Sequence, residues 1–289
     1  MTGWKLRAIA GVVMLGAMGI RSAHAAPKLA ALKPKPGYVM GRCVKMNGQP
    51  MPNVNIFIKG LTMAGQNTET FAKTKANGVY SMRVPAGLYS VYADHKVNAY
   101  GESYAFRLAP LDGESDTQDS SEGVREDFVW KISGLRPGEK AKATSEREWN
   151  YSYYGARVYP DTRRSHGQYP IIEDATSLSQ SYPKDSQLEI SLKPTSALID
   201  GSQGKPIVQR LRLGDDGQWK FGVRNIPVGI YTATAAVIPP GGGKIPVRCK
   251  VEQEGKSLDD VPWAASARIV FPASYNEFGQ SVKLYLARP

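Results

Sequence analysis

The sequence predicts an all-β protein built from two β-sandwiches in tandem. Apolar residues recur at every second position in several short runs, and turn sequences such as Asn-Gly, Asp-Gly and Pro-x-Gly separate these runs. An internal repeat relates the segment 77–93 to the segment 216–235. No capped stretch of helical period follows the N-terminal segment, so strands are expected throughout the rest of the chain.

The first segment, residues 1–25, is predicted to be a cleaved signal peptide. Lys5 and Arg7 form a positive start, Ala8–Ile20 is apolar, and Ala23-His24-Ala25 supplies the small residues that a signal peptidase reads. We expect cleavage after Ala25 and a secreted or periplasmic protein. The alternative is a permanent anchor, but the apolar run is shorter than the roughly 20 residues that a spanning helix needs.

The charge balance limits the class of partner. The chain has 289 residues and a formal net charge of +11, which falls to +8 when Lys5, Arg7 and Arg21 leave with the signal. The positive residues are scattered singly, and no basic stripe or nucleic-acid motif is present. We therefore expect no nucleic-acid partner, and no membrane span once the signal is removed. The sequence does not indicate the oligomeric state.

A short lead-in at 26–36 precedes the first predicted sandwich, 37–110. In this sandwich three runs turn alternate side chains inward. Their inward residues are Val54, Ile56 and Ile58; Tyr80, Met82 and Val84; and Tyr89, Val91 and Ala93.

Residues 111–187 are predicted to be an acidic loop followed by an aromatic-rich insertion that is partly strand. In this region Phe128–Ile132 is expected to add a strand to the first sandwich. The second sandwich is predicted at 188–289.

The internal repeat supports two related sandwiches. Asn77–Val84, Pro85-Ala86-Gly87 and Leu88–Ala93 match Asp216–Val223, Pro227-Val228-Gly229 and Ile230–Ala235 in order. Gly48-Gln49-Pro50 likewise resembles Gly204-Lys205-Pro206. Two homologous units are the simplest explanation for such spacing.

At this level the first unit resembles the carboxypeptidase regulatory-like domain family. The residues that carry the resemblance are Gly41-Arg42-Cys43-Val44, Gly48-Gln49-Pro50, Lys73-Thr74 before Asn77-Gly78-Val79-Tyr80, and Pro85-Ala86-Gly87-Leu88-Tyr89. The match covers 37–110 well and 188–289 less closely. It implies a transthyretin-like or immunoglobulin-like β-sandwich, related to carbohydrate-binding folds, with an accessory role outside the cytoplasm and no catalytic residue.

The sequence contains no catalytic motif that we recognise. Past the signal it has two histidines, His95 and His166, and neither has a second His or a Glu at zinc-motif spacing. Neither a Gly-x-Ser-x-Gly elbow nor a phosphate-binding glycine loop is present. We therefore predict a protein that is not an enzyme and needs no cofactor. The alternative is an unrecognised hydrolase, whose Ser, His and Asp would come from positions distant in the sequence.

An acidic stretch is the one metal candidate. Asp112, Glu114, Asp116 and Asp119 provide carboxylates at short intervals, and calcium prefers six or more oxygen ligands. The stretch departs from an EF-hand loop because Thr117 stands where the glycine belongs. A solvated acidic loop is therefore the alternative to a calcium site.

The aromatic stretch 148–159 is the candidate ligand-binding segment. On a strand, Trp149, Tyr151 and Tyr153 point to one face, whereas Tyr154 lies on the other and Arg157 follows. Aromatic rings bind sugar faces and also anchor protein contacts, or they fill a core between domains. The leading hypothesis is a non-catalytic module that recognises glycan or another cell-envelope component. The alternative is a structural or assembly protein that docks another exported protein.

The two cysteines, Cys43 and Cys249, fall in different repeats. Export places them where a disulfide is stable, but a bridge requires Cα atoms within about 7 Å. Two buried free thiols are the alternative to this candidate disulfide.

Overall fold

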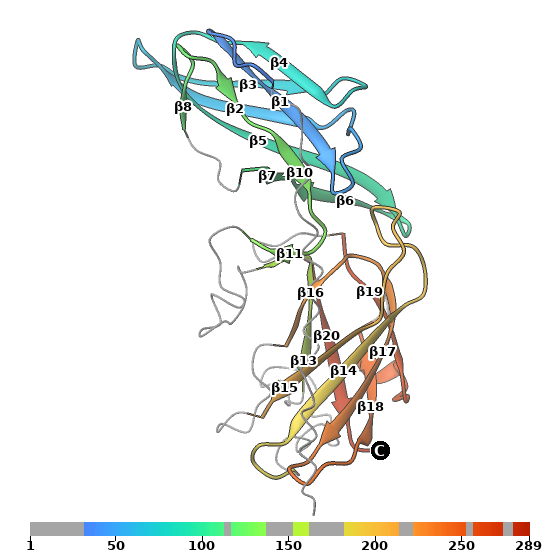
Figure 1. The fold of residues 1–289 in the computed structure, drawn as a ribbon. Coiled ribbons are helices and arrows are strands. Elements are labelled where there is room, and N and C mark those ends of the chain that lie inside the picture. The colour runs from blue at the N-terminus through green and yellow to red at the C-terminus, as the bar shows by residue number, and fades with distance from the viewer. Residues whose placement is uncertain are drawn as a thin grey trace, which may run out of the picture.

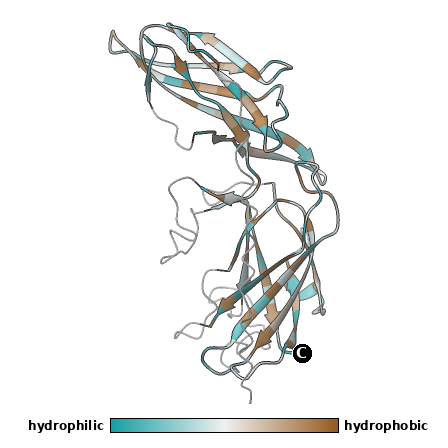
Figure 2. Cartoon of the chain, viewed as in Figure 1, coloured by the Kyte–Doolittle hydropathy of each residue, from teal (hydrophilic) through white to brown (hydrophobic). Residues whose placement is uncertain are grey.

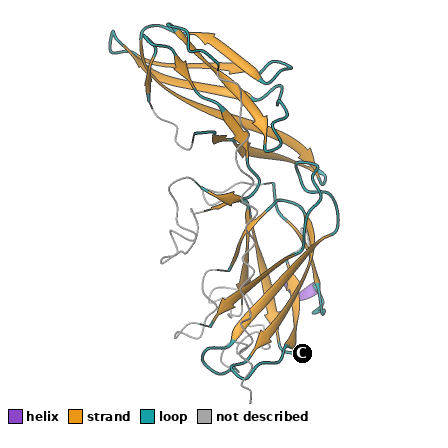
Figure 3. Cartoon of the chain, in the orientation of Figure 1, coloured by secondary structure: helices purple, strands orange, loops and turns teal. Residues whose placement is uncertain are grey.

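The computed structural model describes residues 32–112, 117–136, 153–161, 182–213, 222–252, 257–273 and 280–289. The predicted signal peptide, residues 1–25, lies outside them. Strands dominate the described residues, and a single 3-10 turn, η3 (Leu258–Asp260), is the helical element among them (Figure 3). The described part of the chain holds no helix with the length and hydropathy to cross a membrane. The prediction of an all-β fold with two sandwiches is confirmed.

The first sandwich consists of two sheets that pack face to face (Figure 1). One sheet has the strand order β4-β1-β10-β7, and the other has the order β3-β2-β5-β6. The short strands β9 and β8 pair with β1 and β5. The bounds are β1 (Tyr38–Lys45), β2 (Asn55–Thr62), β3 (Asn67–Lys73), β4 (Val79–Arg83), β5 (Gly87–Ala99), β6 (Glu102–Arg107), β7 (Ala109–Pro110), β8 (Gln118–Asp119), β9 (Val124–Arg125) and β10 (Phe128–Trp130).

The second sandwich has the strand order β15-β14-β17-β18-β20-β13-β16, with β19 also pairing with β17. Its two sheets are joined by β18, whose first half pairs with β17 and whose second half pairs with β20. The bounds are β13 (Ala156–Asp161), β14 (Gln187–Pro194), β15 (Ile207–Arg212), β16 (Val223–Ile226), β17 (Ile230–Ile238), β18 (Ile245–Val251), β19 (Ala267–Val270) and β20 (Ser281–Ala287).

The two sandwiches share one pairing scheme. In the first, β1 pairs antiparallel with β4 and parallel with β10. In the second, β13 pairs in the same way with β16 and β20. The antiparallel trio β3-β2-β5 likewise corresponds to β15-β14-β17. This correspondence supports the repeat that the sequence predicts.

A buried tyrosine marks the same corner in both repeats. Tyr89 donates its hydroxyl hydrogen bond to the carbonyl of Pro85 at 2.9 Å, and Tyr231 donates to the carbonyl of Pro227 at 2.7 Å. Burial raises the pKa of both phenols, so each remains a donor. The Pro-x-Gly-x-Tyr sequence therefore closes each corner with the side chain of its own fifth residue.

The structure places the sandwich boundaries differently from the sequence. The first sandwich includes β10, which confirms the strand predicted at Phe128–Ile132. The second sandwich begins at β13, inside the segment 111–187 that was expected to be an insertion. The segment 162–186 between β13 and β14 is much longer than the segment 46–54 between β1 and β2, which obscures the repeat. The proposed match of Gly48–Pro50 with Gly204–Pro206 is wrong, because the first precedes β2 and the second follows β14.

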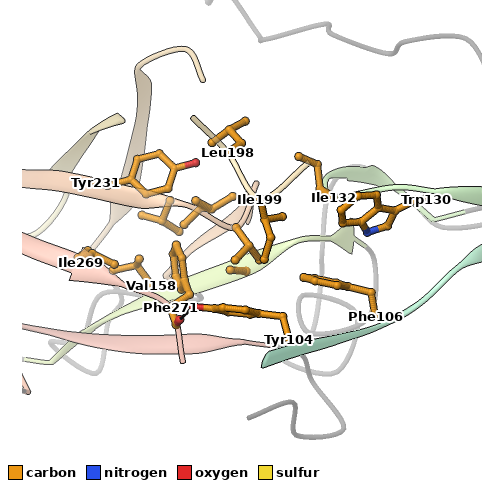
Figure 4. Packing of buried hydrophobic residues seen from close by; sticks show 14 of the residues in the cluster. Tyr104, Phe106, Trp130, Ile132, Val158, Leu198, Ile199, Tyr231, Ile269 and Phe271 are labelled. Carbon is orange, nitrogen blue, oxygen red and sulfur yellow. Dashed lines mark hydrogen bonds between the residues drawn. The ribbon is translucent and has the colours of Figure 1, made fainter. Parts of the chain in front are cut away.

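Inward and outward residues alternate along the strands, as the hydropathy colouring shows (Figure 2). The inward residues of both sandwiches join into one continuous apolar cluster. The cluster passes through the junction between the sandwiches (Figure 4), where its labelled members are Tyr104, Phe106, Trp130, Ile132, Val158, Leu198, Ile199, Tyr231, Ile269 and Phe271.

Hydrogen bonds also connect the two sandwiches at this junction. Tyr104 donates its hydroxyl hydrogen to the carbonyl of Phe271 at 2.8 Å, and Tyr100 donates to the carbonyl of Ala197 at 2.8 Å. The Glu102 carboxylate accepts from the Ala273 amide at 2.8 Å. Burial, with the nearby Glu102 carboxylate, raises the pKa of Tyr104 to about 12. The two sandwiches therefore meet through an apolar core edged by specific polar contacts.

Candidate functional site

Only part of the predicted aromatic site belongs to the described residues. Trp149 and Tyr151 lie outside them. Tyr153 and Tyr154 form β12 (Tyr153–Tyr154), which pairs antiparallel with β11 (Gly134–Leu135) beside the junction. Both tyrosines are half-buried.

Cationic side chains cover the two tyrosine rings. The Arg224 guanidinium lies 4.6 Å from the centroid of Tyr153. The Lys131 ammonium and the Arg136 guanidinium lie 5.5 and 5.1 Å from the centroid of Tyr154. Burial lowers the pKa of Lys131 and of Arg224. These contacts are cation–π pairs in a partly desolvated setting.

Tyr154 also contacts a small apolar cluster of the first sandwich, which contains Val44, Ala109 and Val129. Its ring therefore packs at the junction. Of the three roles weighed for the aromatic stretch, this arrangement favours inter-domain packing for Tyr153 and Tyr154. A sugar needs an uncovered ring face, and the cations compete for these faces.

Arg157 is not available to a surface ligand. It lies on β13 and is 2% exposed, and its backbone amide donates to the carbonyl of Gln280 at 3.0 Å. The prediction that Arg157 lines a binding surface is therefore wrong. The sequence placed it in an insertion that is partly strand, whereas it belongs to β13, which lies between β20 and β16 in the second sandwich.

The acidic candidate is only partly described. Glu114 and Asp116 lie outside the described residues, and Asp112 is exposed. Asp119 is in β8, where its carboxylate accepts from the amide of Ser121 at 2.8 Å. Among the described residues no three His, Cys, Asp or Glu side chains gather as a metal site would require. The calcium site remains a prediction.

The two cysteines are free buried thiols and not a disulfide. Cys43 lies in the core of the first sandwich on β1, and Cys249 lies in the core of the second on β18. The bridge fails because the two residues occupy separate sandwiches. Burial raises the pKa of both thiols, that of Cys249 to about 11, so neither is a reactive thiolate at neutral pH.

Of the two histidines beyond the signal, His166 lies outside the described residues. The ring of His95 packs edge-to-face on Trp130 with centroids 5.0 Å apart. Burial, and then the charge of Lys45, lowers the pKa of His95. The histidine therefore contributes to packing near the junction as a neutral ring.

A surface that sequence reasoning missed lies on the outer side of the sheet β3-β2-β5. Phe57 is in register with Phe71 on one side and with Tyr92 on the other. These three side chains point away from the core, because Ile56 and Ile58 on either side of Phe57 are fully buried. Four residues further along β2, Leu61 forms a second outward pair in register with Leu88 of β5. We call these five residues the outer apolar face.

The outer apolar face is accessible. Phe71 is 57% exposed, Leu61 and Leu88 are each nearly half-exposed, and Met63 beyond the end of β2 is 79% exposed. Phe57 and Phe71 pack edge-to-face at 5.2 Å with an interplanar angle of 80°. The face is therefore apolar but not flat, because its aromatic rings stand at an angle to one another. Its residues are aromatic and aliphatic, and the thioether of Met63 lies beside them.

Paired charges surround this face. Lys59 and Glu69 form a cross-strand ion pair at 3.6 Å, and Arg107 pairs with Asp94 while its guanidinium lies 5.1 Å from the centroid of Tyr92. Lys73, Lys96 and Asp119 are further outward charges on these strands, so positive and negative side chains nearly balance.

The second sandwich has no such surface at the equivalent positions. Tyr92 corresponds to Thr234 in the repeat, and the pairing of Thr234 with Ser191 and of Ser191 with Val208 then completes the equivalent row. One row is Phe71-Phe57-Tyr92 and the other is Val208-Ser191-Thr234. The signal in the sequence was a large aromatic residue at a position that alternation reserves for polar side chains.

No family model and no curated protein matches the chain. Among solved structures, the Bacillus anthracis TIE protein is similar over 88% of this chain and 34% of its own, with 12% identity and a TM-score of 0.29. The chain thus spans about a third of that protein. The shaft pilin SpaA from Lactobacillus rhamnosus GG is similar over 88% and 99%, with 12% identity and a TM-score of 0.23.

A DUF3823 family protein from Bacteroides ovatus is similar over 82% and 99%, with 8% identity and a TM-score of 0.19. These identities and scores assign neither a family nor an activity to the chain. The resemblance to carboxypeptidase regulatory-like domains stays a prediction from the sequence.

Proposed function

We propose that this protein is an exported, non-catalytic docking module that binds another protein through the outer apolar face. The observation that carries the proposal is the row Phe71-Phe57-Tyr92, which faces solvent in the first sandwich and is absent from the equivalent row of the second. An exposed apolar patch rimmed by polar residues is typical of protein contact sites. The N-terminal pattern of residues 1–25 supports export.

The composition of the face favours protein over glycan. Leu61, Leu88 and Met63 add aliphatic and thioether area, which suits the apolar centre of a protein interface. Sugar recognition relies on flat aromatic platforms, whereas Phe57 and Phe71 stand at 80° to one another. The ion pairs Lys59–Glu69 and Arg107–Asp94 provide the polar rim.

Site-specific photocrosslinking in the producing cells tests the proposal. A benzophenone amino acid in place of Phe71 is expected to yield a discrete protein adduct, and the same group in place of Val208 is the matched control. Val208 is 49% exposed on the equivalent strand, so accessibility is comparable. Equal adduct formation at both positions, or none at Phe71, contradicts docking. Saccharide binding that Phe71→Ala abolishes, without any adduct, favours the glycan hypothesis instead.

A further inference from the structure

We propose that the partner bound by the outer apolar face is a second copy of this chain, which rests on the docking function proposed above. The first argument is electrostatic. After the predicted loss of the signal peptide the chain keeps a formal net charge of +8, so two copies repel one another over most of their surface. Around the outer apolar face the charges nearly balance, with Lys59, Lys73, Lys96 and Arg107 against Glu69, Asp94 and Asp119. This is a place where two copies approach with little repulsion.

The second argument is self-complementarity, which a two-fold interface requires. A two-fold axis along the row Phe71-Phe57-Tyr92 lies across the strands and places each ring opposite its own copy. The residue two positions before Phe71 then faces the residue two positions after it, so Glu69 of one copy faces Lys73 of the other. On β2, Lys59 faces Asn55 of the other copy, and on β5, Ser90 faces Asp94. No two like charges oppose one another among these positions.

The third argument is the form of the layer. Two such sheets that pack face to face, about 10 Å apart, reproduce the interior of a β-sandwich. The aromatic row lies at the centre, and the ion pair Lys59–Glu69 flanks it at half-exposed positions. Leu88 lies four residues before Tyr92, so under the same axis it faces the aliphatic stem of Lys96 of the other copy. Burying these groups removes apolar area from water, which is the main favourable term in association.

Sedimentation velocity of the purified chain over a range of concentrations tests the inference. We expect a monomer–dimer equilibrium that Phe71→Glu weakens at least tenfold, whereas Val208→Glu in the second sandwich leaves it unchanged. Circular dichroism confirms that both variants fold, which is expected because both side chains are exposed.

A charge-reversal pair tests the axis itself. Lys73→Glu places Glu69 opposite a carboxylate of the other copy and weakens the dimer. The triple variant Lys59→Glu/Glu69→Lys/Lys73→Glu restores the facing opposite charges and keeps the cross-strand ion pair between positions 59 and 69, so it restores the dimer. Positions 69 and 73 lie four residues apart along β3, too far to pair within one chain, so restoration reports an intermolecular contact. Equal dimerisation of the single and triple variants overturns the axis.

A monomer at every concentration overturns the second copy as the partner. If a crosslinker at Phe71 then captures a different exported protein, docking survives and self-association fails. If the chain is monomeric and position 71 forms no adduct, both fail.

Discussion

The outer faces of the two sandwiches differ although their strands pair alike. In the first, Phe71, Phe57 and Tyr92 stand in one row, whereas in the second the row is Val208, Ser191 and Thr234. Inward positions are apolar in both, and both corners use a buried tyrosine. The second sandwich thus forms the same sheet without aromatic residues on its outer side. The row of the first is not a requirement of the fold, and this is why we assign a function to it.

The corner tyrosines are the strictest test that the two repeats are physically equivalent. Tyr89 and Tyr231 are buried, so Tyr89→Ala and Tyr231→Ala are each expected to lower the free energy of unfolding by about 3–5 kcal/mol through the cavity left behind. Chemical denaturation of the two variants measures the losses. A loss below about 1 kcal/mol at either site breaks the equivalence of the corners.

A smaller effect on stability is expected where β15 meets β16 in the second sandwich. The Gln209 amide donates to the carbonyl of Arg224 at 2.8 Å and accepts from its backbone N–H at 3.4 Å, joining β15 to β16. The equivalent residue of β3 is Ala72. We expect Gln209→Ala to cost about 1 kcal/mol by loss of these hydrogen bonds. Urea unfolding measures this loss. An unchanged unfolding midpoint means that the contact between β15 and β16 does not depend on the Gln209 side chain.

The pH dependence of stability is expected to come in part from the first sandwich at His95. Its pKa lies below the ordinary value of 6.5, so the folded state favours the neutral ring. The stabilisation is complete above pH 6.5 and is lost as the pH falls through the folded-state pKa. His95→Phe keeps the ring contact with Trp130 and is expected to flatten this decline. Parallel pH profiles of wild type and variant contradict the assignment.

The smallest effect on stability is expected on the outer faces of the two sandwiches, where their side chains differ most. Phe71→Ser and Val208→Ser each change an exposed side chain, so both are expected to alter the free energy of unfolding by no more than about 0.5 kcal/mol. Thermal and urea unfolding of both variants make the comparison. A destabilisation above about 1 kcal/mol for Phe71→Ser alone means that the ring supports the fold and weakens the case for docking.

Local patterns predicted the fold well because the causes are local. Alternation identified the inward residues of β2 and β5, and Pro-x-Gly-x-Tyr identified both corners because the tyrosine bonds to a carbonyl four residues earlier. The strand β13 was missed because the long segment 162–186 separates it from β14. No nearby sequence signal indicates this pairing, since β13 contacts β20 at the far end of the chain.

The candidate site was harder to predict because its neighbours are distant in sequence. The aromatic stretch does not indicate its own contacts, because Arg224 reaches Tyr153 from β16 and Lys131, the residue after β10, reaches Tyr154. The residues of the outer apolar face occupy outward positions of the alternating pattern. That pattern was used to identify core residues only, so apolar side chains at outward positions were not considered. Only the pairing of three strands shows that Phe71, Phe57 and Tyr92 are neighbours.

The junction between the sandwiches has a mechanical consequence. Tyr100 binds Ala197 in the connection from β14 to β15, whereas Glu102 and Tyr104 bind Ala273 and Phe271 in the connection from β19 to β20. Attachment at separate points around an apolar centre opposes rotation about any single pivot. We therefore expect a partner bound at the outer apolar face, as proposed above, to keep a nearly constant distance and orientation relative to the second sandwich.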